Sequence, residues 1–240
     1  MKATGFEFRH RAWLIALLYT LGFWAYAIDH TNTVQFFIQE FAGTHSPRGS
    51  LLAHLFFAFA TLLVALGALI RTWGAAYLRS DVVHDAQLHS GVLVADGPYR
   101  YMRNPLYLGG ILSTIGVGFM ASRLGFVFLV VALTLLFIRL IGREEAELEQ
   151  QQGESYREYC RRVPRIFPSF APRLPAGDTK PQWGQAFRGE AFMWGFALAV
   201  ASFTATLNLL ISGVIWVVAM LAFWQQQYIH NRRRRAAPAA

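Results

Sequence analysis

The sequence predicts an all-α, polytopic membrane helical bundle with about six transmembrane helices and both termini in the cytoplasm. Of its 240 residues, 55% are hydrophobic and only 15% are charged, whereas soluble domains average roughly 25% charged. Several apolar stretches approach or exceed the roughly 18 residues that cross a bilayer. The basic residues, moreover, cluster on one side of these stretches. Together these observations favour a membrane protein over a soluble enzyme with one large core.

The predicted spans follow from five apolar runs. Four of them have the length of single helices: Trp13–Ile28, Leu51–Ile70, Leu106–Ala121 and Leu124–Ile141. The fifth, Phe192–Trp224, has 33 residues without Lys, Arg, Asp or Glu. As one helix it would measure about 50 Å, against a hydrocarbon core of about 30 Å. We therefore expect two short helices that turn near Asn208–Gly213.

The positions of the basic residues support this topology. With about six spans and both ends inside, every Lys and Arg except Arg48 and Arg123 lies on the cytoplasmic side, as expected because short cytoplasmic loops collect basic residues. A single final span would place Arg232–Arg235 on the wrong face. The membrane topology thus explains most of the net charge of +8. We therefore expect a lipid bilayer and not nucleic acid as the partner.

The first apolar run has a second interpretation. Basic residues, an apolar stretch and Ala25-Tyr26-Ala27 resemble a cleaved signal peptide. The aromatic residues in and around the run favour a retained helix, because aromatic side chains mark the ends of transmembrane helices: Trp13, Tyr19, Trp24 and Tyr26.

The chain divides into N-terminal membrane helices (1–80), a central core (81–190), and a C-terminal transmembrane hairpin with a basic tail (191–240). Two polar segments on the basic side, Arg71–Pro105 and Gly142–Arg188, are the candidates for chemistry. In the second, helix formers predict that the fourth span continues to Gln152, that Gly153 interrupts it, and that Glu154–Arg162 forms a further short helix. Prolines between Pro164 and Pro181 then predict an extended path.

The densest run of unusual residues precedes the third span. It contains Gly97-Pro98-Tyr99 and Arg103-Asn104-Pro105-Leu106-Tyr107-Leu108-Gly109. Tyrosine and arginine favour the membrane interface and proline favours a first helical turn, so the segment has a plain interpretation as an anchor. It also places many donors where the following helix exposes unpaired amides, a suitable position for an anionic group. Gly110, Thr114 and Gly118 recur every four residues in this span, which predicts close helix packing or a narrow groove for a flat ring.

A second cluster, Arg143-Glu144-Glu145, follows the fourth span. Adjacent helical side chains point about 100° apart, so one carboxylate can face inward while the other meets solvent. Charged groups near the membrane usually face the bundle or a water-filled cavity and are functional candidates. Arg143 or Arg139 could orient an acceptor carboxylate.

Other chemistry is less well supported. His84, Asp85 and His89 are close in sequence, but no pattern places them on one face, so no metal site is assigned. His54 fits a hydrogen-bonded histidine within the bundle. One cysteine, Cys160, excludes an internal disulfide and a cysteine-only metal cluster.

Taken in order, these motifs resemble the isoprenylcysteine carboxyl methyltransferase family. They are the Gly-Pro-Tyr turn, the Arg103–Gly109 run, Glu144-Glu145, Gly153-Glu154-x-Tyr156-x-x-Tyr159 and Val163-Pro164-x-x-x-Pro168. That family belongs to a wider group with the phospholipid methyltransferases. The resemblance covers residues from about 93 to 168, roughly a third of the chain.

The resemblance implies an integral membrane methyltransferase that binds S-adenosylmethionine between the helix ends and a cytosolic segment that closes over this cofactor. Motif by motif, it implies that the donor pocket is lined by Tyr99, Arg103, Asn104, Pro105, Tyr107, Gly109, Glu144, Tyr156 and Tyr159, with Pro164 in the closing tail. Arg143, Glu144 and Glu145 are the candidate catalytic residues. The family usually has histidine at the position of Asn104, and an amide cannot carry charge.

The acceptor implied first is an isoprenylated cysteine carboxylate, and an amine or thiol on an apolar body is equally compatible. We expect the enzyme in a bacterial inner membrane with its site facing the cytoplasm. Two alternatives are an NADPH-dependent membrane reductase of related architecture and a non-catalytic membrane protein whose site has decayed.

Overall fold

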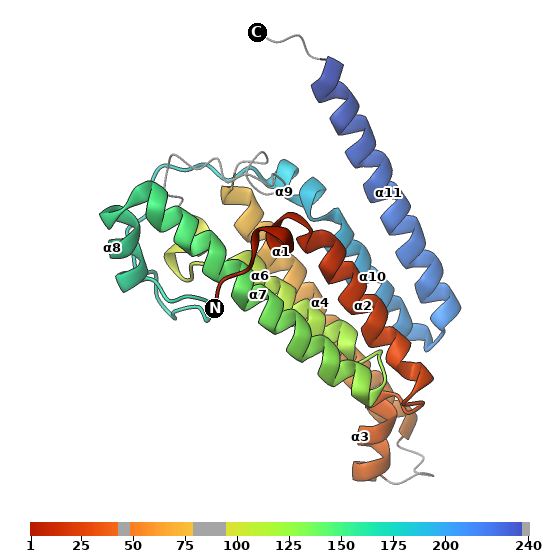
Figure 1. The fold of residues 1–240 in the computed structure, drawn as a ribbon. Coiled ribbons are helices and arrows are strands. Elements are labelled where there is room, and N and C mark those ends of the chain that lie inside the picture. Colours follow the sequence, from red (N-terminus) through yellow and green to blue (C-terminus); the bar gives the residue numbers. More distant parts are fainter. Residues whose placement is uncertain (43–48, 79–94, 237–240) are drawn as a thin grey trace.

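A computed structural model describes residues 1–42, 49–78 and 95–236, and Figure 1 shows their arrangement. The described residues form helices joined by irregular segments, with one isolated bridge between Asn32 and Ser122. The elements in chain order are α1 (Gly5–Arg9), α2 (Arg11–Trp24), η1 (Ala25–Ala27), α3 (Thr33–Ala42), α4 (Gly49–Tyr77), η2 (Gly97–Arg100), α6 (Pro105–Gly118), α7 (Arg123–Gln152), α8 (Glu154–Arg162), α9 (Trp183–Gly189), α10 (Ala191–Thr206) and α11 (Leu209–Ala236).

The all-helical character predicted from the sequence is confirmed for the described residues, and the structure is consistent with a membrane protein. Helices α4 and α7 are long and apolar enough to cross a bilayer, and α6, α10 and residues Leu209–Gln225 of α11 form shorter apolar helices. The number of spans, the position of the termini and the division into three parts stay predictions. Sequence reasoning missed three helices in the loops, namely α1, α3 and α9.

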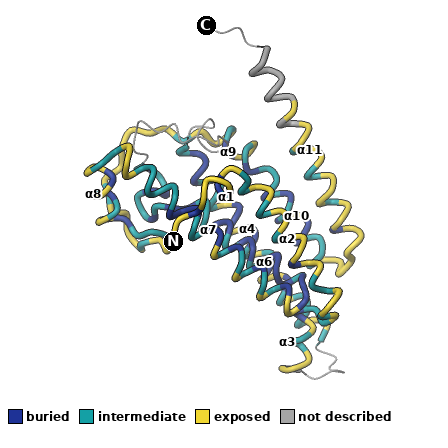
Figure 2. Tube along the Cα trace, in the orientation of Figure 1, coloured by how far each residue is buried: buried dark blue, intermediate teal, exposed yellow. Residues whose placement is uncertain are grey.

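The outer surface of the bundle is apolar, as a lipid environment requires. Figure 2 shows the long exposed stretches of α11 and the more buried α4 and α6. Large hydrophobic side chains are exposed along α4, α7 and α11, among them Leu62, Leu69, Val131, Leu210 and Val218. Because a soluble protein rarely exposes so large an apolar surface, we interpret these side chains as facing lipid.

The predicted extension of the fourth span is confirmed. Helix α7 runs without a break to Gln152, and Gly153 has φ 57°, a left-handed value that favours glycine. Helix α8 then covers Glu154–Arg162, as predicted. Residues 163–182, which we call the strap, contain no helix and run to α9.

The last apolar run forms two helices, as its length predicted. Helix α10 ends at Thr206, and Leu207 adopts φ 49° beyond it. The Asn208 side-chain oxygen accepts hydrogen bonds from the backbone N–H groups of Leu210 (2.9 Å) and Ile211 (3.3 Å), and so begins α11. The two helices pack side by side, and α10 also packs on α4 (Figure 1).

Close packing of α4 against α6 aligns the N-terminus of α6. A Cβ atom on Gly67 would lie 2.5 Å from the Gly109 carbonyl oxygen, and one on Gly116 would lie 2.6 Å from the Ala60 carbonyl oxygen. The small residues that the sequence singled out in this span do not face α4. Gly110 faces Phe137 of α7, and Thr114 forms a hydrogen bond of 3.0 Å with Tyr19 of α2. Gly67, Gly109 and Gly116 are therefore residues that let α4 and α6 approach.

Substituting Gly67 with alanine should destabilise the bundle, because the new methyl group would push α6 away from α4. We expect a loss of about 1–3 kcal/mol, typical of overpacking, measured as unfolding in detergent followed by circular dichroism. Gly213→Ala in α11 is the matched control, because nothing lies within 4 Å of the added Cβ there. Equal stability of both variants would contradict the proposed role of this contact.

Candidate functional site

The Gly-Pro-Tyr turn forms a rigid entry to α6. Gly97 has φ 56°, and a Cβ there would strike the Tyr77 ring. The Pro98 carbonyl oxygen accepts hydrogen bonds from the backbone N–H groups of Tyr101 (2.9 Å) and Met102 (3.1 Å). Asn104 then lies at the N-cap of α6, and Pro105 occupies the first turn. This geometry holds the side chains of Asn104 and Tyr107 toward the neighbouring helix.

Both carboxylates of the acidic pair on α7 contact the beginning of α6. The Tyr107 hydroxyl donates to Glu144 Oε1 at 2.7 Å, and Asn104 Nδ2 donates to Glu145 Oε1 at 3.1 Å. The expectation that one of the two carboxylates meets solvent holds only in part: Glu145 contacts α6, although 15% of its side chain stays exposed. Glu145 reaches Asn104 because the N-cap residue lies nearer the end of α7 than Tyr107 does. The structure thus brings together the two clusters that the sequence separates.

Glu145 is the centre of a charged network. Its Oε1 lies 3.4 Å from Arg103 Nη1, and its Oε2 accepts a hydrogen bond from Arg165 Nε at 2.8 Å. Asn104 Nδ2 also donates to the Arg165 carbonyl oxygen at 3.0 Å. One carboxylate therefore joins α7, the N-cap of α6 and the first residues of the strap.

The strap is hydrogen-bonded along the entry to α6. The backbone N–H of Arg103 donates to the Pro164 carbonyl (2.9 Å), Ser169 N–H donates to the Tyr101 carbonyl (3.0 Å), and Arg173 N–H donates to the Arg100 carbonyl (2.8 Å). Further along, the Asp96 carboxylate accepts from the N–H groups of Gly177 (2.6 Å) and Thr179 (3.2 Å). Hydrogen bonds from Thr179 and Gly177 hold the pKa of Asp96 below its usual value. The prolines of the strap thus leave carbonyl and N–H groups that pair with this entry segment.

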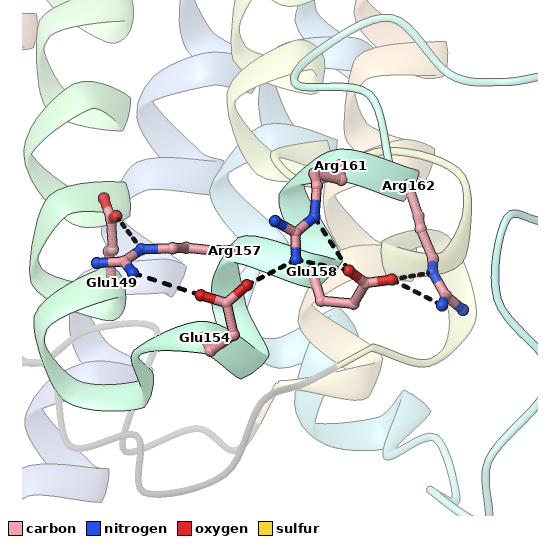
Figure 3. Close-up of polar contacts among 6 residues, drawn as sticks. All are labelled: Glu149, Glu154, Arg157, Glu158, Arg161 and Arg162. Atoms are coloured by element: carbon pink, nitrogen blue, oxygen red, sulfur yellow. Dashed lines mark hydrogen bonds and ion pairs between the residues drawn. The ribbon is translucent and has the colours of Figure 1, made fainter.

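Helix α8 closes the site with its inner face. Tyr156 and Tyr159 are buried, with ring centroids 5.9 Å apart, and the Tyr159 hydroxyl donates to the Tyr99 carbonyl at 2.9 Å. On the exposed face, charged side chains pair in a continuous row, as Figure 3 shows: Glu149, Arg157, Glu154, Arg161, Glu158 and Arg162. The Arg157–Glu149 pair (2.8 Å) spans the break at Gly153 and ties α8 to α7.

Two buried polar atoms in this site lack hydrogen-bond partners within the described part of the chain, Tyr99 Oη and Arg103 Nε. Tyr99 is only 7% exposed. Burial raises the pKa of Tyr99 well above its usual value, and the nearby Tyr159 and Glu144 raise it further. Because buried polar groups are normally hydrogen-bonded, these two atoms are the natural contacts for a bound ligand.

Sequence reasoning missed a buried ion pair beside the site. Arg71 of α4 donates from Nε to Glu190 Oε2 (2.7 Å) and from Nη2 to Glu190 Oε1 (3.0 Å). Its Nη1 also donates to the Leu106 carbonyl in the first turn of α6 (3.1 Å). The one available signal was the position of Glu190, the last acidic residue before the final apolar run.

Several predicted residues point elsewhere. Arg143 pairs with Glu147 at 2.7 Å and lies over the Phe8 ring at 5.3 Å, so it faces α1. Arg139 pairs with Glu7 through Nη2 (2.7 Å) and Nε (3.1 Å). Gly109 faces α4, where a Cβ would meet Arg71 Cγ at 2.5 Å. Pro105 also packs toward α4, beside Gly74.

The remaining candidates lie outside this cluster. His84, Asp85 and His89 fall outside the described residues, and in the described ranges no group of three or more His, Cys, Asp or Glu side chains could hold a metal ion. The His54 ring nitrogen Nδ1 lies 2.6 Å from the Thr204 carbonyl, as expected for a hydrogen-bonded histidine in the bundle. Cys160 is free and partly buried.

Comparison with known proteins identifies the group to which this arrangement is similar. Residues 55–155 match the family model of phospholipid methyltransferases. The chain is 28% identical over 116 residues to protein-S-isoprenylcysteine O-methyltransferase B of Arabidopsis thaliana, covering 46% of this chain and 58% of the plant protein. The predicted resemblance to the wider group of isoprenylcysteine and phospholipid methyltransferases is therefore confirmed.

Two bacterial relatives have names that refer to metal resistance. The cobalt-zinc-cadmium resistance protein CzcN of Cupriavidus metallidurans is 31% identical over 124 residues, 51% of this chain and 54% of the relative. The nickel-cobalt-cadmium resistance protein NccN of Alcaligenes xylosoxydans xylosoxydans is 29% identical over 108 residues, 45% and 47% of the two chains. The chain thus spans about half the length of the curated relatives that it matches. No solved structure matches.

Proposed function

We propose that this chain, whose residues 55–155 match the family model of phospholipid methyltransferases, transfers a methyl group from S-adenosylmethionine to a lipophilic acceptor. The reaction takes place at the cytoplasmic interface of the membrane. The acceptor carries a carboxylate, an amine or a thiol on an apolar body. A bacterial inner membrane is the proposed location.

One observation carries the proposal: the contacts of Glu144 and Glu145 with Tyr107 and Asn104 unite two clusters that are about forty residues apart in sequence. They do so at the end of two apolar helices, beneath a strap and an aromatic helix face. A segment that only anchored the chain at the membrane interface would not need these contacts between α6, α7 and the strap. It would also give no reason for the buried Tyr99 hydroxyl to lack a hydrogen-bond partner.

The side chains present fit the proposed donor. Carboxylates such as Glu144 can accept hydrogen bonds from its amino or ribose groups, and the faces of Tyr156 and Tyr159 suit a cationic sulfonium. The unpaired Tyr99 Oη and Arg103 Nε offer one further hydrogen bond each. When bound, S-adenosylmethionine supplies an activated methyl group, which leaves its sulfur as the acceptor forms the new bond.

The protein's contribution is alignment and exclusion of water, since methyl transfer from a sulfonium needs little covalent help. The strap covers the entry to α6 from the polar side. Exposed apolar side chains of α7, such as Val127 and Val131, face outward from the bundle, so a lipid-tailed acceptor can enter laterally while the polar donor arrives from the cytosol.

The test is donor binding and methyl transfer by the purified chain in detergent. We expect S-adenosylmethionine to bind with micromolar affinity by calorimetry, NADPH to bind at least tenfold more weakly, and membranes containing the chain to transfer a tritiated methyl group into the lipid fraction. A well-folded protein that binds neither would be a non-catalytic member of the group, and preferential NADPH binding would indicate the reductase alternative.

A further inference from the structure

The buried pair of Arg71 and Glu190 joins three helices beside the proposed site. The Glu190 side chain is 1% exposed and Arg71 is 19% exposed, and both carboxylate oxygens of Glu190 are occupied by Arg71 nitrogens at 2.7 and 3.0 Å. Glu190 lies at the junction of α9 and α10, beyond the residues 55–155 that match the methyltransferase family. The pair therefore connects the segment that matches the family model with residues beyond it.

Arg71 is part of the same cluster as the site tyrosines. Its Nη1 donates a hydrogen bond to the Leu106 carbonyl, and the hydroxyl of the next residue, Tyr107, donates to Glu144. The unpaired Tyr99 hydroxyl lies close enough to Arg71, Glu144 and Glu190 for their charges to affect its pKa. The guanidinium thus lies on the α4 side of the site, opposite the acidic pair of α7.

Four other arginines around the site pair with carboxylates of the chain. Arg103 and Arg165 pair with Glu145, Arg139 pairs with Glu7, and Arg143 pairs with Glu147. Arg139 and Arg143, the residues expected to orient an acceptor carboxylate, are directed at the N-terminal segment. Arg71 differs from these four because it bonds to the first turn of α6 and its carboxylate partner, Glu190, lies outside residues 55–155.

We propose that Arg71 lines the acceptor site and that Glu190 is a specificity-determining residue, which occupies this guanidinium and thereby bars acceptors that react through a carboxylate. This inference rests on the proposed function and narrows it to acceptors with an uncharged nucleophile. An acceptor carboxylate would have to displace Glu190 or remain buried beside two other carboxylates without a cation. Either course is unfavourable, because a buried charge needs a partner.

The test compares binding of two probes with the same tail, palmitic acid and hexadecanol, to the full chain in detergent, with empty micelles subtracted. Wild-type protein should bind hexadecanol at least as tightly as palmitic acid. Glu190→Gln, which keeps the shape and removes the charge, should bind palmitic acid at least tenfold more tightly than wild type. Glu190→Asp should behave as wild type, and Arg71→Gln combined with Glu190→Gln should lose the gain.

Preferential binding of palmitic acid by wild-type protein would overturn the inference, and so would unchanged palmitic acid binding in Glu190→Gln. The comparison of palmitic acid with hexadecanol on wild-type protein tests the inference even if the variants fold poorly. For a destabilised Glu190→Gln, a second readout is thermal unfolding in sodium formate against sodium chloride. Formate should raise the unfolding midpoint of Glu190→Gln and leave that of wild type unchanged. No difference between the two salts would mean that the pair is purely structural and would also overturn the inference. Binding of S-adenosylmethionine, measured in parallel, tests the proposed function separately.

Discussion

Replacing Glu145 with alanine is expected to lower the affinity for S-adenosylmethionine at least about 100-fold, which corresponds to about 2.7 kcal/mol. Glu145 accepts from Asn104 at 3.1 Å and from Arg165 at 2.8 Å, and it lies 3.4 Å from Arg103. Hydrogen bonds to charged groups contribute roughly 1.5–3 kcal/mol each. Without this carboxylate the N-cap of α6, the end of α7 and the strap lose their common partner. Calorimetry in detergent measures the change directly.

Glu147→Ala, two residues further along α7, is the matched control. Glu147 pairs with Arg143 at 2.7 Å, and both side chains are about 30% exposed, so we expect at most about a twofold change, as for other exposed pairs. Limited proteolysis gives an independent readout, because Glu145→Ala should expose the strap to cleavage and Glu147→Ala should not. Equal donor affinity in the two variants would mean that the network around Glu145 is not part of the donor site.

The parts of this site that follow from local rules were predictable. Gly153 ends α7 because only glycine readily adopts its positive φ, and the residues after it form a helix with one aromatic and one charged face. The break at Leu207–Asn208 follows from the length of the apolar run against the bilayer. The ordered motifs identified the group because they are local signals.

The contacts between helices were not predictable in the same way. Glu144 and Glu145 both reach α6, although neighbouring helical residues point about 100° apart, because Asn104 and Tyr107 lie a turn apart along the facing helix. Arg143 faces α1, a helix that the sequence did not predict. The partner of Arg71 lies more than a hundred residues further along the chain. Such pairings depend on how helices are rotated and stacked, which periodicity does not determine.

Glu190→Ala is expected to be the most destabilising single substitution considered, at about 3–5 kcal/mol, the usual result of removing one partner from a buried ion pair. Arg71 would be left with one neutral acceptor, the Leu106 carbonyl, and no counter-charge. Unfolding in detergent, followed by circular dichroism, measures the loss.

Replacing both residues with methionine should restore most of that stability, because apolar side chains of similar size often match a buried ion pair. The double variant should at the same time bind palmitic acid no better than wild type, since it has no guanidinium to pair with the carboxylate. Stability would then be restored without the gain in palmitic acid binding that is expected of Glu190→Gln. A double variant that stays as unstable as Glu190→Ala would show instead that the charged pair is needed to hold α10 against α4.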